Sequence, residues 1–431
     1  MMRATSPSFT SAFIPQRVPP HPTVFLLRQC YSSFVKLLLR LLAIIFLLLV
    51  IAIVAIPSIV ENHFNKTLQK PPYRVSAQAE TLHRKLIVAD LHGDSLLWKR
   101  NLLRRSSRGH IDLPRLQEGN VAIQAFTLVT TSPRGLNIYK NSDSTDMIRD
   151  LAMAQLWPPR TWNSPKERAL YEAAKLHAFA EKSNGSLVII KSAADLQHFL
   201  SSRQSGQVAG FLGTEGAQPL EGKLENLEVL YTAGIRMMAP THFTDTAVGG
   251  SAAGLTKAGL TDLGRQWVRA MEAKHMIIDL AHASTATLRD VTAMAAKPVL
   301  VSHTGVKGTC NNPRNLSDDE LRAIAKTGGV VGIGLWDTAT CGTDARAAAR
   351  SIRYAVQIVG IDHVGLGSDF DGAVVEPFDS SGWPLLTDAL LKEGFTPEEI
   401  RKIMGENVVR VLLETLPCGN PCRQTVVALT P

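Results

Sequence analysis

The sequence predicts an α/β fold, a (β/α)8 barrel of the TIM type, preceded by one N-terminal transmembrane helix. Eight short apolar segments alternate with segments of helical periodicity between residues 86 and 416, and this alternation is typical of parallel strands joined by helices. The stretch suits one such barrel, since these run from about 200 to more than 400 residues. An uninterrupted apolar run, 41–56, follows a basic N-terminal segment.

The N-terminal segment, residues 1–36, is basic and lacks acidic residues, and an apolar stretch, 37–60, follows it. That stretch is long enough for one membrane span of about 20 residues. Because Lys and Arg accumulate on the cytoplasmic side, we expect residues 1–36 in the cytoplasm. The rest of the chain then lies on the periplasmic or extracytoplasmic side of the inner (plasma) membrane. A cleaved signal peptide is the alternative, but no A-x-A pattern follows the apolar run, which favours an uncleaved signal anchor.

The positive charge is concentrated at the N-terminus. The net charge is 46 − 38 = +8, and +5 of it lies in the first forty residues, which leaves 8 − 5 = +3 for the remainder. The basic balance therefore fits a membrane anchor and predicts no nucleic-acid partner. A polar linker, 61–85, containing Pro71-Pro72, leads to the barrel at 86–416, and a tail, 417–431, ends the chain.

The predicted strands are apolar runs rich in β-branched residues. Runs without polar alternation, such as Leu86-Ile87-Val88-Ala89, are typical of parallel strands buried on both faces. The eight segments are Leu86–Leu91, Val121–Leu128, Val208–Thr214, Ile235–Thr241, Met276–Ala281, Pro298–Ser302, Val330–Leu335 and His363–Ser368.

Helical periodicity lies between most of these strands. It is clear in Asp262–Lys274 and in Asp318–Thr327. The last helix has a start signal, Thr396-Pro397-Glu398-Glu399, in which Thr caps the helix, Pro occupies its first turn and Glu follows three residues after the cap.

Cysteine usage fits an oxidising compartment. Four of the five cysteines follow the apolar stretch, and this even number permits two disulfides, Cys310 with Cys341 and Cys418 with Cys422. The alternative for Cys310 and Cys341 is two free buried thiols. A four-cysteine zinc site is disfavoured because the pairs lie far apart and lack C-x-x-C spacing.

Side chains able to bind a metal or transfer a proton follow six of the eight predicted strands. In a barrel the carboxyl ends of the strands meet at one face, so these side chains should converge. His92 and Asp94 are two residues apart after the first strand, and in extended chain residues i and i+2 point the same way. The others follow later strands and are Glu215, His242, His282, His303 and Asp369.

Three imidazoles and two carboxylates are enough to hold two divalent cations, with one carboxylate bridging them. A thiol-free set of this kind suits Zn²⁺, and it also accepts Mn²⁺ or Co²⁺. The chain has no H-E-x-x-H motif, which excludes the helix-borne zinc-protease site, and no G-x-S-x-G elbow or Walker loop in a suitable context.

At these residues the chain resembles a known family, the membrane (renal) dipeptidases of peptidase family M19. The resemblance extends from about residue 84 to about 416. It rests on Asp90-Leu-His-Gly-Asp94, His110-Ile-Asp-Leu-Pro-Arg115, Thr214-Glu-Gly216, Ile278-Asp-Leu-Ala-His-Ala-Ser284, Ser302-His303, Pro313-Arg-Asn315 and Gly367-Ser-Asp-Phe-Asp-Gly372.

The resemblance implies a barrel hydrolase with two Zn²⁺ per chain. His92 and Asp94 would hold one zinc ion, His282 and His303 the other, and Glu215 would bridge them. The implied activity is hydrolysis of the peptide bond of dipeptides, including those with a C-terminal D-residue, by a hydroxide that bridges the metals. The resemblance is also compatible with a homodimer.

The family pattern assigns three further roles. His242 would polarise the scissile carbonyl or the oxyanion of the tetrahedral intermediate, and Asp369 would carry a proton from the water to the leaving amine. Arg314 would pair with the terminal carboxylate of the substrate, because Arg forms a two-pronged bond with carboxylates. The alternatives are a surface salt bridge for Arg314 and an N-cap for Asp369. Asp279 and Asp371 are assigned to structural roles.

The sequence departs from the better-studied dipeptidases at two places. Gly93 stands where many members carry Asn. A side chain at this position is expected to point away from the ligands, so the difference should not affect the zinc. After His242 a Gly- and Ala-rich loop, 243–254, has Asp245 where the animal enzymes tend to have Asn. This loop resembles a bacterial branch of the family and is expected to form a wall of the substrate pocket.

Two other functions remain open at the level of sequence. One is a two-metal hydrolase of lactones, β-lactams or phosphoesters on the same barrel, and the other is a barrel that binds a partner without turnover. Arg314 discriminates against the first, because a neutral lactone offers it no carboxylate. The complete ligand set with Asp369 argues against the second, since binding alone requires no proton carrier.

Overall fold

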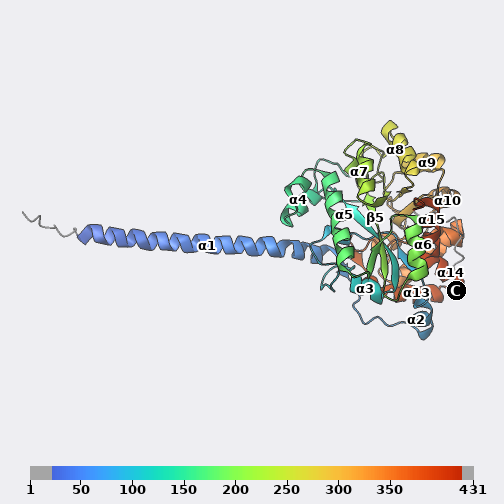
Figure 1. Ribbon diagram of the computed structural model, residues 1–431, viewed down its shortest axis with the longest axis horizontal. Coiled ribbons are helices and arrows are strands. Elements are labelled where there is room, and N and C mark those ends of the chain that lie inside the picture. Colours follow the sequence, from blue (N-terminus) through green and yellow to red (C-terminus); the bar gives the residue numbers. More distant parts are fainter. Residues whose placement is uncertain (1–21, 420–431) are drawn as a thin grey trace, which may run out of the picture. The chain divides into compact units, whose positions relative to one another are not determined.

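The computed structural model describes the backbone of residues 22–419 (Figure 1). The chain forms two compact units, 1–55 and 56–431, which are described separately. Helix α1 (Pro22–Phe64) accounts for the described part of the first unit and ends in the second. Its most apolar window, Tyr31–Leu48, has a mean hydropathy of 2.0 and is not buried. By length and composition this helix can cross a membrane, and the window overlaps the predicted span at 37–60.

The second unit is built on a parallel sheet whose strands run in the order β7-β6-β5-β3-β2-β10-β9-β8, with β4 paired to β5. Each of the eight predicted strands corresponds to one strand in this order, so the predicted barrel is confirmed. The strands are β2 (Val88–Asp90), β3 (Val121–Val129), β4 (Leu187–Ile189), β5 (Val208–Glu215), β6 (Ile235–Met238), β7 (Ile277–Ile278), β8 (Leu300–Thr304), β9 (Val330–Ile333) and β10 (Val364–Leu366).

The sheet curls until its two end strands, β7 and β8, meet. A parallel bridge joins Asp279 to Leu300, and the Leu280 amide donates to the Leu300 carbonyl across 2.7 Å. The carboxylate of Asp279 accepts from the amides of Ala281 (3.0 Å) and Ser302 (2.8 Å). Asp279 therefore fastens the two end strands together, which is a structural role of the kind that the sequence predicted.

Strand β4 is the one strand of the sheet that the sequence analysis did not predict. It pairs with the first half of β5, from Val208 to Gly210, whereas β6 pairs with the second half. Because β4 has only three residues and two of them are half-buried, its hydrophobic signal is too short to stand out from the neighbouring helices.

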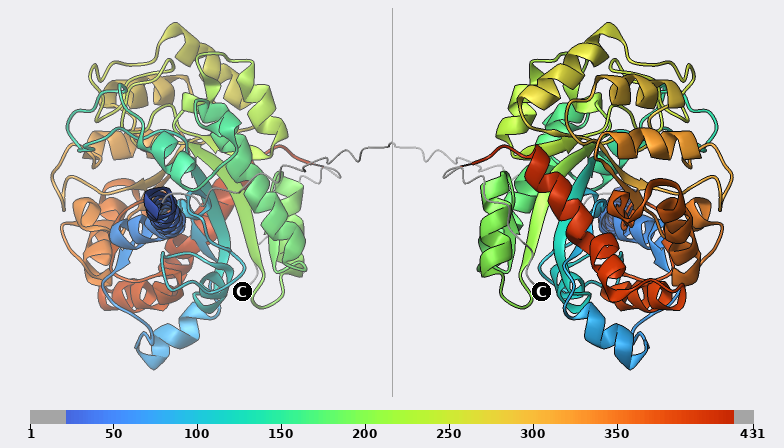
Figure 2. Two further views of the ribbon diagram at one scale, coloured as in Figure 1. Left: turned by 90° about the vertical axis from the view of Figure 1, so that its left-hand side faces the viewer. Right: turned by 90° about the vertical axis from the view of Figure 1, so that its right-hand side faces the viewer.

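Helices surround the strands (Figure 2). Those predicted at 262–274 and 318–327 are present as α8 and α10, and Thr396 caps α14 through a reciprocal capping box with Glu399. The helices are α2 (Ala77–His83), α3 (Leu113–Glu118), α4 (Met147–Ala154), α5 (Pro165–Lys182), α6 (Ala193–Ser202), α7 (Asn226–Thr232), α8 (Asp262–Ala273), α9 (Thr285–Met294), α10 (Asp318–Lys326), α11 (Asp337–Thr340), α12 (Ala345–Val359), α13 (Trp383–Lys392), α14 (Pro397–Arg401) and α15 (Asn407–Thr415).

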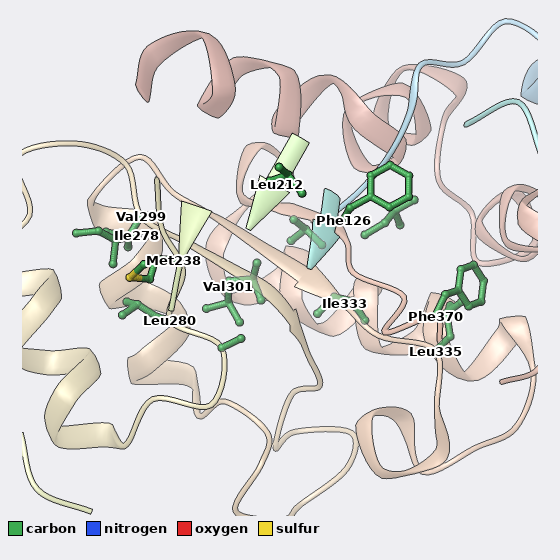
Figure 3. Packing of buried hydrophobic residues seen from close by; sticks show 14 of the residues in the cluster. Phe126, Leu212, Met238, Ile278, Leu280, Val299, Val301, Ile333, Leu335 and Phe370 are labelled. Atoms are coloured by element: carbon green, nitrogen blue, oxygen red, sulfur yellow. The ribbon is translucent and has the colours of Figure 1, made fainter. Parts of the chain in front are cut away.

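Neighbouring residues of one strand belong to two different hydrophobic clusters. Leu212 packs in a large cluster that includes side chains of α5, α8, α12 and α13 (Figure 3). Phe211, the preceding residue, packs in a second cluster with α6 and α15. Because side chains alternate along a strand, Glu215 lies on the same face of β5 as Phe211. The strand thereby delivers one carboxylate to the face opposite the large cluster.

The segment predicted as a linker, 61–85, contains regular structure. It includes α2 and the short strand β1 (Lys66–Thr67), which pairs in parallel with β11 (Val375–Glu376). β11 follows the loop that leaves β10, so this part of the chain is bonded to residues some 300 positions later.

The predicted disulfide between Cys310 and Cys341 is present, with an S–S distance of 2.11 Å. It closes a loop that contains Arg314. The second predicted pair cannot be followed, because Cys422 lies outside the described residues.

Candidate metal centre

All eight side chains that the sequence assigned to the site lie at the carboxyl ends of the barrel strands, and all are buried. His92 and Asp94 follow β2, Glu215 ends β5, His242 follows β6, His282 follows β7, His303 lies in β8, Arg314 lies in the loop after β8, and Asp369 follows β10.

Glu215 stands at the centre of the site. Its Oε1 atom lies 3.0 Å from Nε2 of His282, 3.4 Å from Nε2 of His303 and 3.6 Å from Nε2 of His92. Its Oε2 atom lies 3.3 Å from Nε2 of His242. Burial raises the pKa of Glu215 well above its ordinary value, although His92 opposes that rise. A carboxylate in contact with four imidazoles is placed where it can bridge two cations.

His92 presents a buried nitrogen that lacks a hydrogen-bond partner among the described residues. Nε2 is this atom, and it lies 3.5 Å from Oδ1 of Asp94 and 3.9 Å from Oδ1 of Asp369. Burial lowers the pKa of His92, but Asp94 and Glu215 more than offset this effect and raise it to about 10. A buried polar atom without a partner is costly. A cation bound to Nε2 of His92, in place of the proton that the raised pKa keeps on the ring, would satisfy this nitrogen.

The donor atoms form three groups, each with its atoms within 4.8 Å of one another, as a shared cation requires. His92, Asp94 and Glu215 form one group, and Glu215, His242 and His282 form the second. The third contains His92, His303 and Asp369. These imidazole nitrogens and carboxylate oxygens are ligands that Zn²⁺ accepts, so the residues present fit a centre with more than one divalent cation.

Ser302 orients two of the imidazoles. Its Oγ atom lies 2.9 Å from Nδ1 of His92 and 3.0 Å from Nδ1 of His303. A hydroxyl oxygen can accept two hydrogen bonds. If both Nδ1 atoms carry the proton, both Nε2 atoms keep their lone pairs for a metal, as is common around metal-bound histidines.

The Thr131 carbonyl fixes the tautomer of His242, because Nδ1 lies 3.2 Å from this oxygen, which can only accept a hydrogen bond. Burial lowers the pKa of His242 to about 3, so the neutral ring turns an Nε2 lone pair toward Glu215. His242 can donate a proton from Nε2 only as an imidazolium.

Arg314 is enclosed beside the imidazoles, with only 7% of the residue exposed. Its Nη2 atom lies 3.2 Å from Nε2 of His282 and donates to the His303 carbonyl across 3.0 Å. Within the described residues no carboxylate lies within 4 Å of its guanidinium. The surface salt bridge considered for Arg314 is therefore wrong, and this buried guanidinium has no carboxylate partner among the described residues.

Asp369 is held in a strained turn. Its backbone has φ = 63°, in the left-handed region that non-glycine residues rarely adopt. Burial raises the pKa of its carboxyl to about 7, although His92 opposes that rise. The neighbouring Ser368 donates its hydroxyl to Asp90 across 2.6 Å, and the Asp90 carboxylate also accepts from the Ser368 amide (2.9 Å). Such strain is typical of functional sites.

A cavity of about 320 Å³ is lined in part by Thr131, whose carbonyl bonds to His242. The loop after β6 supplies one wall through residues 244–247, which include Asp245, and its role as a wall of the substrate pocket stays a prediction. Asp245 accepts from the amides of Ser251 and Thr256, each across 2.8 Å, so this carboxylate shapes the loop that borders the cavity. Gly93 does not line this cavity. A Cβ on Gly93 would meet Ile111, away from the ligands, as predicted.

Sequence reasoning missed three residues that hold the ligands. Ser302 was noted only as the neighbour of His303, and Thr127 and Thr131 were not singled out. Thr127 lies inside β3 and Thr131 acts through its backbone carbonyl, so neither carries a sequence signal of its own. Their roles depend on β3 lying beside β2 and β5 in the sheet.

The barrel and the ligands gathered at its strand ends define a metal-dependent hydrolase of the TIM-barrel class. The chain belongs to peptidase family M19, the membrane dipeptidases, whose family model matches residues 76–423.

Two curated relatives are dipeptidases. Dipeptidase aclJ of Aspergillus oryzae is 29% identical over 355 residues, which cover 77% of this chain and 79% of that protein. An uncharacterized dipeptidase of Schizosaccharomyces pombe is 29% identical over 320 residues, which cover 71% of this chain and 72% of that protein.

Solved structures of similar fold include a metallo peptidase from Rhodobacter sphaeroides, bound to a phosphinate mimic of the dipeptide L-Ala-D-Ala. It is 25% identical, with a TM-score of 0.64, and the match covers 77% of this chain and 99% of that chain. The probable dipeptidase PvdM from Pseudomonas aeruginosa is 20% identical, with a TM-score of 0.65 and coverage of 79% and 98%. The second likeness shows the fold alone.

Proposed function

We propose that this protein is a zinc-dependent dipeptidase that hydrolyses the peptide bond of dipeptides. The observation that carries the proposal is the buried guanidinium of Arg314, which lies 3.2 Å from Nε2 of His282 and pairs with no carboxylate of the described residues. A free terminal carboxylate would meet this charge with a two-pronged bond. Because Arg314 borders the metal centre, only the peptide bond next to that terminus would reach the reacting position.

The centre would hold two Zn²⁺, with His92 and Asp94 on one ion and His282 and His303 on the other. Glu215 would bridge them, in line with its Oε1 atom lying 3.0 to 3.6 Å from three of these imidazoles. Zinc ions bound there would acidify a water molecule and polarise the substrate carbonyl.

The chain itself would supply proton transfer and charge stabilisation. Asp369 has Oδ1 3.9 Å from Nε2 of His92 and a side chain that is 12% exposed, and from there it would carry a proton from the water to the leaving amine. His242 would stabilise the oxyanion from Nε2. Since Nδ1 bonds to Thr131, this role requires an imidazolium, which the developing negative charge would favour.

We include dipeptides with a C-terminal D-residue among the substrates. The Rhodobacter sphaeroides relative was solved with a mimic of L-Ala-D-Ala. Because Arg314 would fix the carboxylate and not the side chain, both configurations at the C-terminal residue can present that group.

Hydrolysis by the zinc-loaded full-length protein tests this function. The substrates are L-Ala-L-Ala, L-Ala-D-Ala, an N-blocked tripeptide and a lactone, each with wild type, Arg314→Ala and Arg322→Ala. Arg322 is an exposed arginine that pairs with Asp319 on the surface, so it is a matched control. We expect wild type to cleave the dipeptides. In Arg314→Ala alone, kcat/KM for dipeptides should fall by an amount equivalent to about 2 to 4 kcal/mol of transition-state stabilisation.

A different result would identify the alternative chemistry. If the lactone turns over and Arg314→Ala leaves its rate unchanged, the metal centre stands and the dipeptidase assignment is wrong. If no substrate turns over while zinc remains bound, the dipeptidase assignment is wrong, and a barrel that binds a partner without catalysis becomes the favoured alternative.

We further propose that α1 is an uncleaved anchor with the barrel on the extracytoplasmic side of the inner (plasma) membrane. The basic residues that precede the apolar window support this orientation. Protease treatment of intact spheroplasts should degrade a tag at the C-terminus and spare one at the N-terminus, and loss of the N-terminal tag from the mature chain would indicate cleavage. Light scattering of the purified protein tests the expected homodimer.

A further inference from the structure

The loop that carries Asp369 has an unusual backbone. Asp369, Asp371 and Ala373 all have positive φ angles, 63°, 67° and 62°, although none is glycine. Residues with a Cβ avoid this region, so such a loop persists only where its surroundings over-determine it. The contacts that hold residues 369–376 therefore set the position of the Asp369 carboxylate.

Asp371 is the first point at which the loop is held. Its carboxylate accepts from the amides of His110 (2.6 Å) and Ile111 (3.2 Å) and pairs with Arg100. Arg100 in turn pairs through Nε with Oε1 of Glu61, 2.6 Å away, and Glu61 is only 1% exposed. Glu61 belongs to the last turns of α1, so a residue of the helix that leaves the membrane completes this buried chain of charges.

Asn65 is the second point. Its Oδ1 atom accepts from the amide of Ala373 across 2.9 Å, and the residue is 4% exposed. The next two residues form β1, which pairs with β11 at the end of the same loop. His110 joins both points, because Nδ1 lies 3.0 Å from the Asp371 amide and Nε2 lies 3.1 Å from the Lys66 carbonyl.

We propose that Glu61, in the last turn of α1, and Asn65, which directly follows α1, are positioning residues for Asp369. They would act by holding residues 369–376 in their strained conformation, without contact with substrate or metal. The segment precedes residues 76–423, to which the family model applies, so this device belongs to the chain's own membrane-proximal extension. The inference rests on the proposed function, since it assumes that Asp369 transfers the proton.

The negative charge of Glu61 balances buried arginines, and water would not take over this role. Glu61 faces Arg100 (2.6 Å) and Arg108 (3.1 Å), while Arg100 also faces Asp371. Without Glu61 the buried Arg100 keeps a single carboxylate, which is the one that anchors the loop. Arg100 and Asp371 would then be drawn toward water, because a poorly compensated buried charge is costly.

The test compares Asn65→Ala with Asn62→Ala in the full-length, zinc-loaded protein in detergent. Asn62 is an exposed asparagine three residues earlier, in the last turn of α1, so the two variants make the same chemical change. We expect Asn65→Ala to lower kcat for L-Ala-L-Ala by roughly 10- to 100-fold, the size of effect that misplaced catalytic groups produce. KM and zinc content should stay unchanged, and Asn62→Ala should match wild type.

Two further variants separate positioning from general stability. Asn65→Asp keeps the oxygen that accepts from Ala373, so it should recover most of kcat. In an Asp369→Asn background, Asn65→Ala should cause no additional loss, because both changes act through the same carboxylate. Equal losses with and without Asp369, or zinc loss together with raised KM, would overturn the proposal.

Hydrogen exchange supplies a readout that does not depend on activity. In Asn65→Ala and Glu61→Gln, peptides covering residues 369–376 should exchange faster than in wild type, while peptides from β5 and β8 should be unchanged. Unchanged exchange in 369–376 overturns the proposal even if activity falls. If wild type hydrolyses no dipeptide, the proposed function fails, and the exchange data alone then decide whether the segment holds the loop.

Discussion

The hydroxyl group of Thr127 donates to Oδ1 of Asp94 across 2.5 Å, and both residues are buried. The same hydroxyl oxygen accepts from the amide of Gly93, 3.1 Å away. One side chain of β3 thus fixes the carboxylate of Asp94 and the backbone that separates it from His92. Because this hydrogen bond selects one orientation of the carboxylate, Thr127 sets which of its oxygens faces the imidazoles.

We therefore expect Thr127→Val to weaken metal binding without changing the shape of the core. Loss of a partner behind a metal ligand typically reduces affinity by about 10- to 100-fold. Competition with a chelator of known zinc affinity measures this effect. Thr127→Ser keeps the hydroxyl and should retain the affinity of wild type, so equal weakening in both variants would contradict the role given to the hydrogen bond.

A second prediction concerns Gly93, which stands between the two ligands that follow β2. A Cβ added there would overlap Cδ1 of Ile111 and lie 3.0 Å from Nε2 of Gln124. Gly93→Ala should lower the free energy of unfolding by about 1–3 kcal/mol, the usual range for overpacking a core. Zinc content should not change, since the added methyl group points away from His92 and Asp94.

The matched variant for this test is the double change Gly93→Ala with Ile111→Val, which removes the Cδ1 atom that the new methyl group meets. Denaturant unfolding should show that the double variant recovers part of the stability lost in Gly93→Ala. If the two losses simply add, the contact with Ile111 is not the cause.

The sequence predicted the parts of this site that depend on the chain order of a barrel. His92, Asp94, Glu215, His282 and His303 each lie at the end of an apolar run, so counting strands was enough to bring them together. His242 and Asp369 also follow predicted strands, whereas Arg314 was assigned through the family motif, and the surroundings of all three came only from the structure. The chain's own periodicity thus predicts which side chains gather at the strand ends, and the assignment of five of them as metal ligands stays a prediction that the family resemblance implies.

The contacts that hold those ligands could not be predicted, because they join residues far apart in sequence. Ser302 serves two imidazoles through one oxygen, and nothing in the sequence separates it from other buried serines. The segment containing Glu61 and Asn65 was interpreted as a linker on its polar composition. Its pairing with β11 depends on a strand of two residues, which is too short for any periodic signal.

A third prediction is a pH dependence of stability that comes from His83. This residue is 3% exposed, and its ring nitrogens lie 2.8 Å from Oγ1 of Thr387 and 3.0 Å from the carbonyl of Gly119. Burial lowers its pKa from the usual 6.5 to about 4. The unfolded chain therefore takes up a proton near pH 6.5 while the folded protein stays neutral until about pH 4.

This difference in bound protons determines how the stability of the folded protein changes with pH. Between pH 6.5 and 4 the unfolded state binds more protons, so stability should fall as the pH is lowered, by about 3 kcal/mol in total from this group. His83→Gln should lose the dependence while wild type keeps it. Urea unfolding at pH 7, 5.5 and 4.5, compared between the two proteins, measures it, and parallel curves would show that His83 does not titrate as described.

The last prediction concerns the disulfide and Arg314, which lies inside the loop that Cys310 and Cys341 close. Asn315, next to Arg314, donates to the Cys310 carbonyl across 2.7 Å and to the Ala339 carbonyl across 3.1 Å. The disulfide therefore holds together the two segments on which the Arg314 loop rests. Cys310→Ser with Cys341→Ser should cost about 3–4 kcal/mol of unfolding free energy, given the length of the closed loop.

The functional consequence should be confined to substrate binding. Because the proposed metal ligands come from the strand ends and not from this loop, zinc affinity should remain that of wild type, while KM for L-Ala-L-Ala rises as Arg314 loses its fixed position. Steady-state kinetics and chelator competition on the double variant, with the exposed Arg322→Ala as a control, measure both quantities. Loss of zinc with unchanged KM would mean that the disulfide supports the metal centre instead of the Arg314 loop.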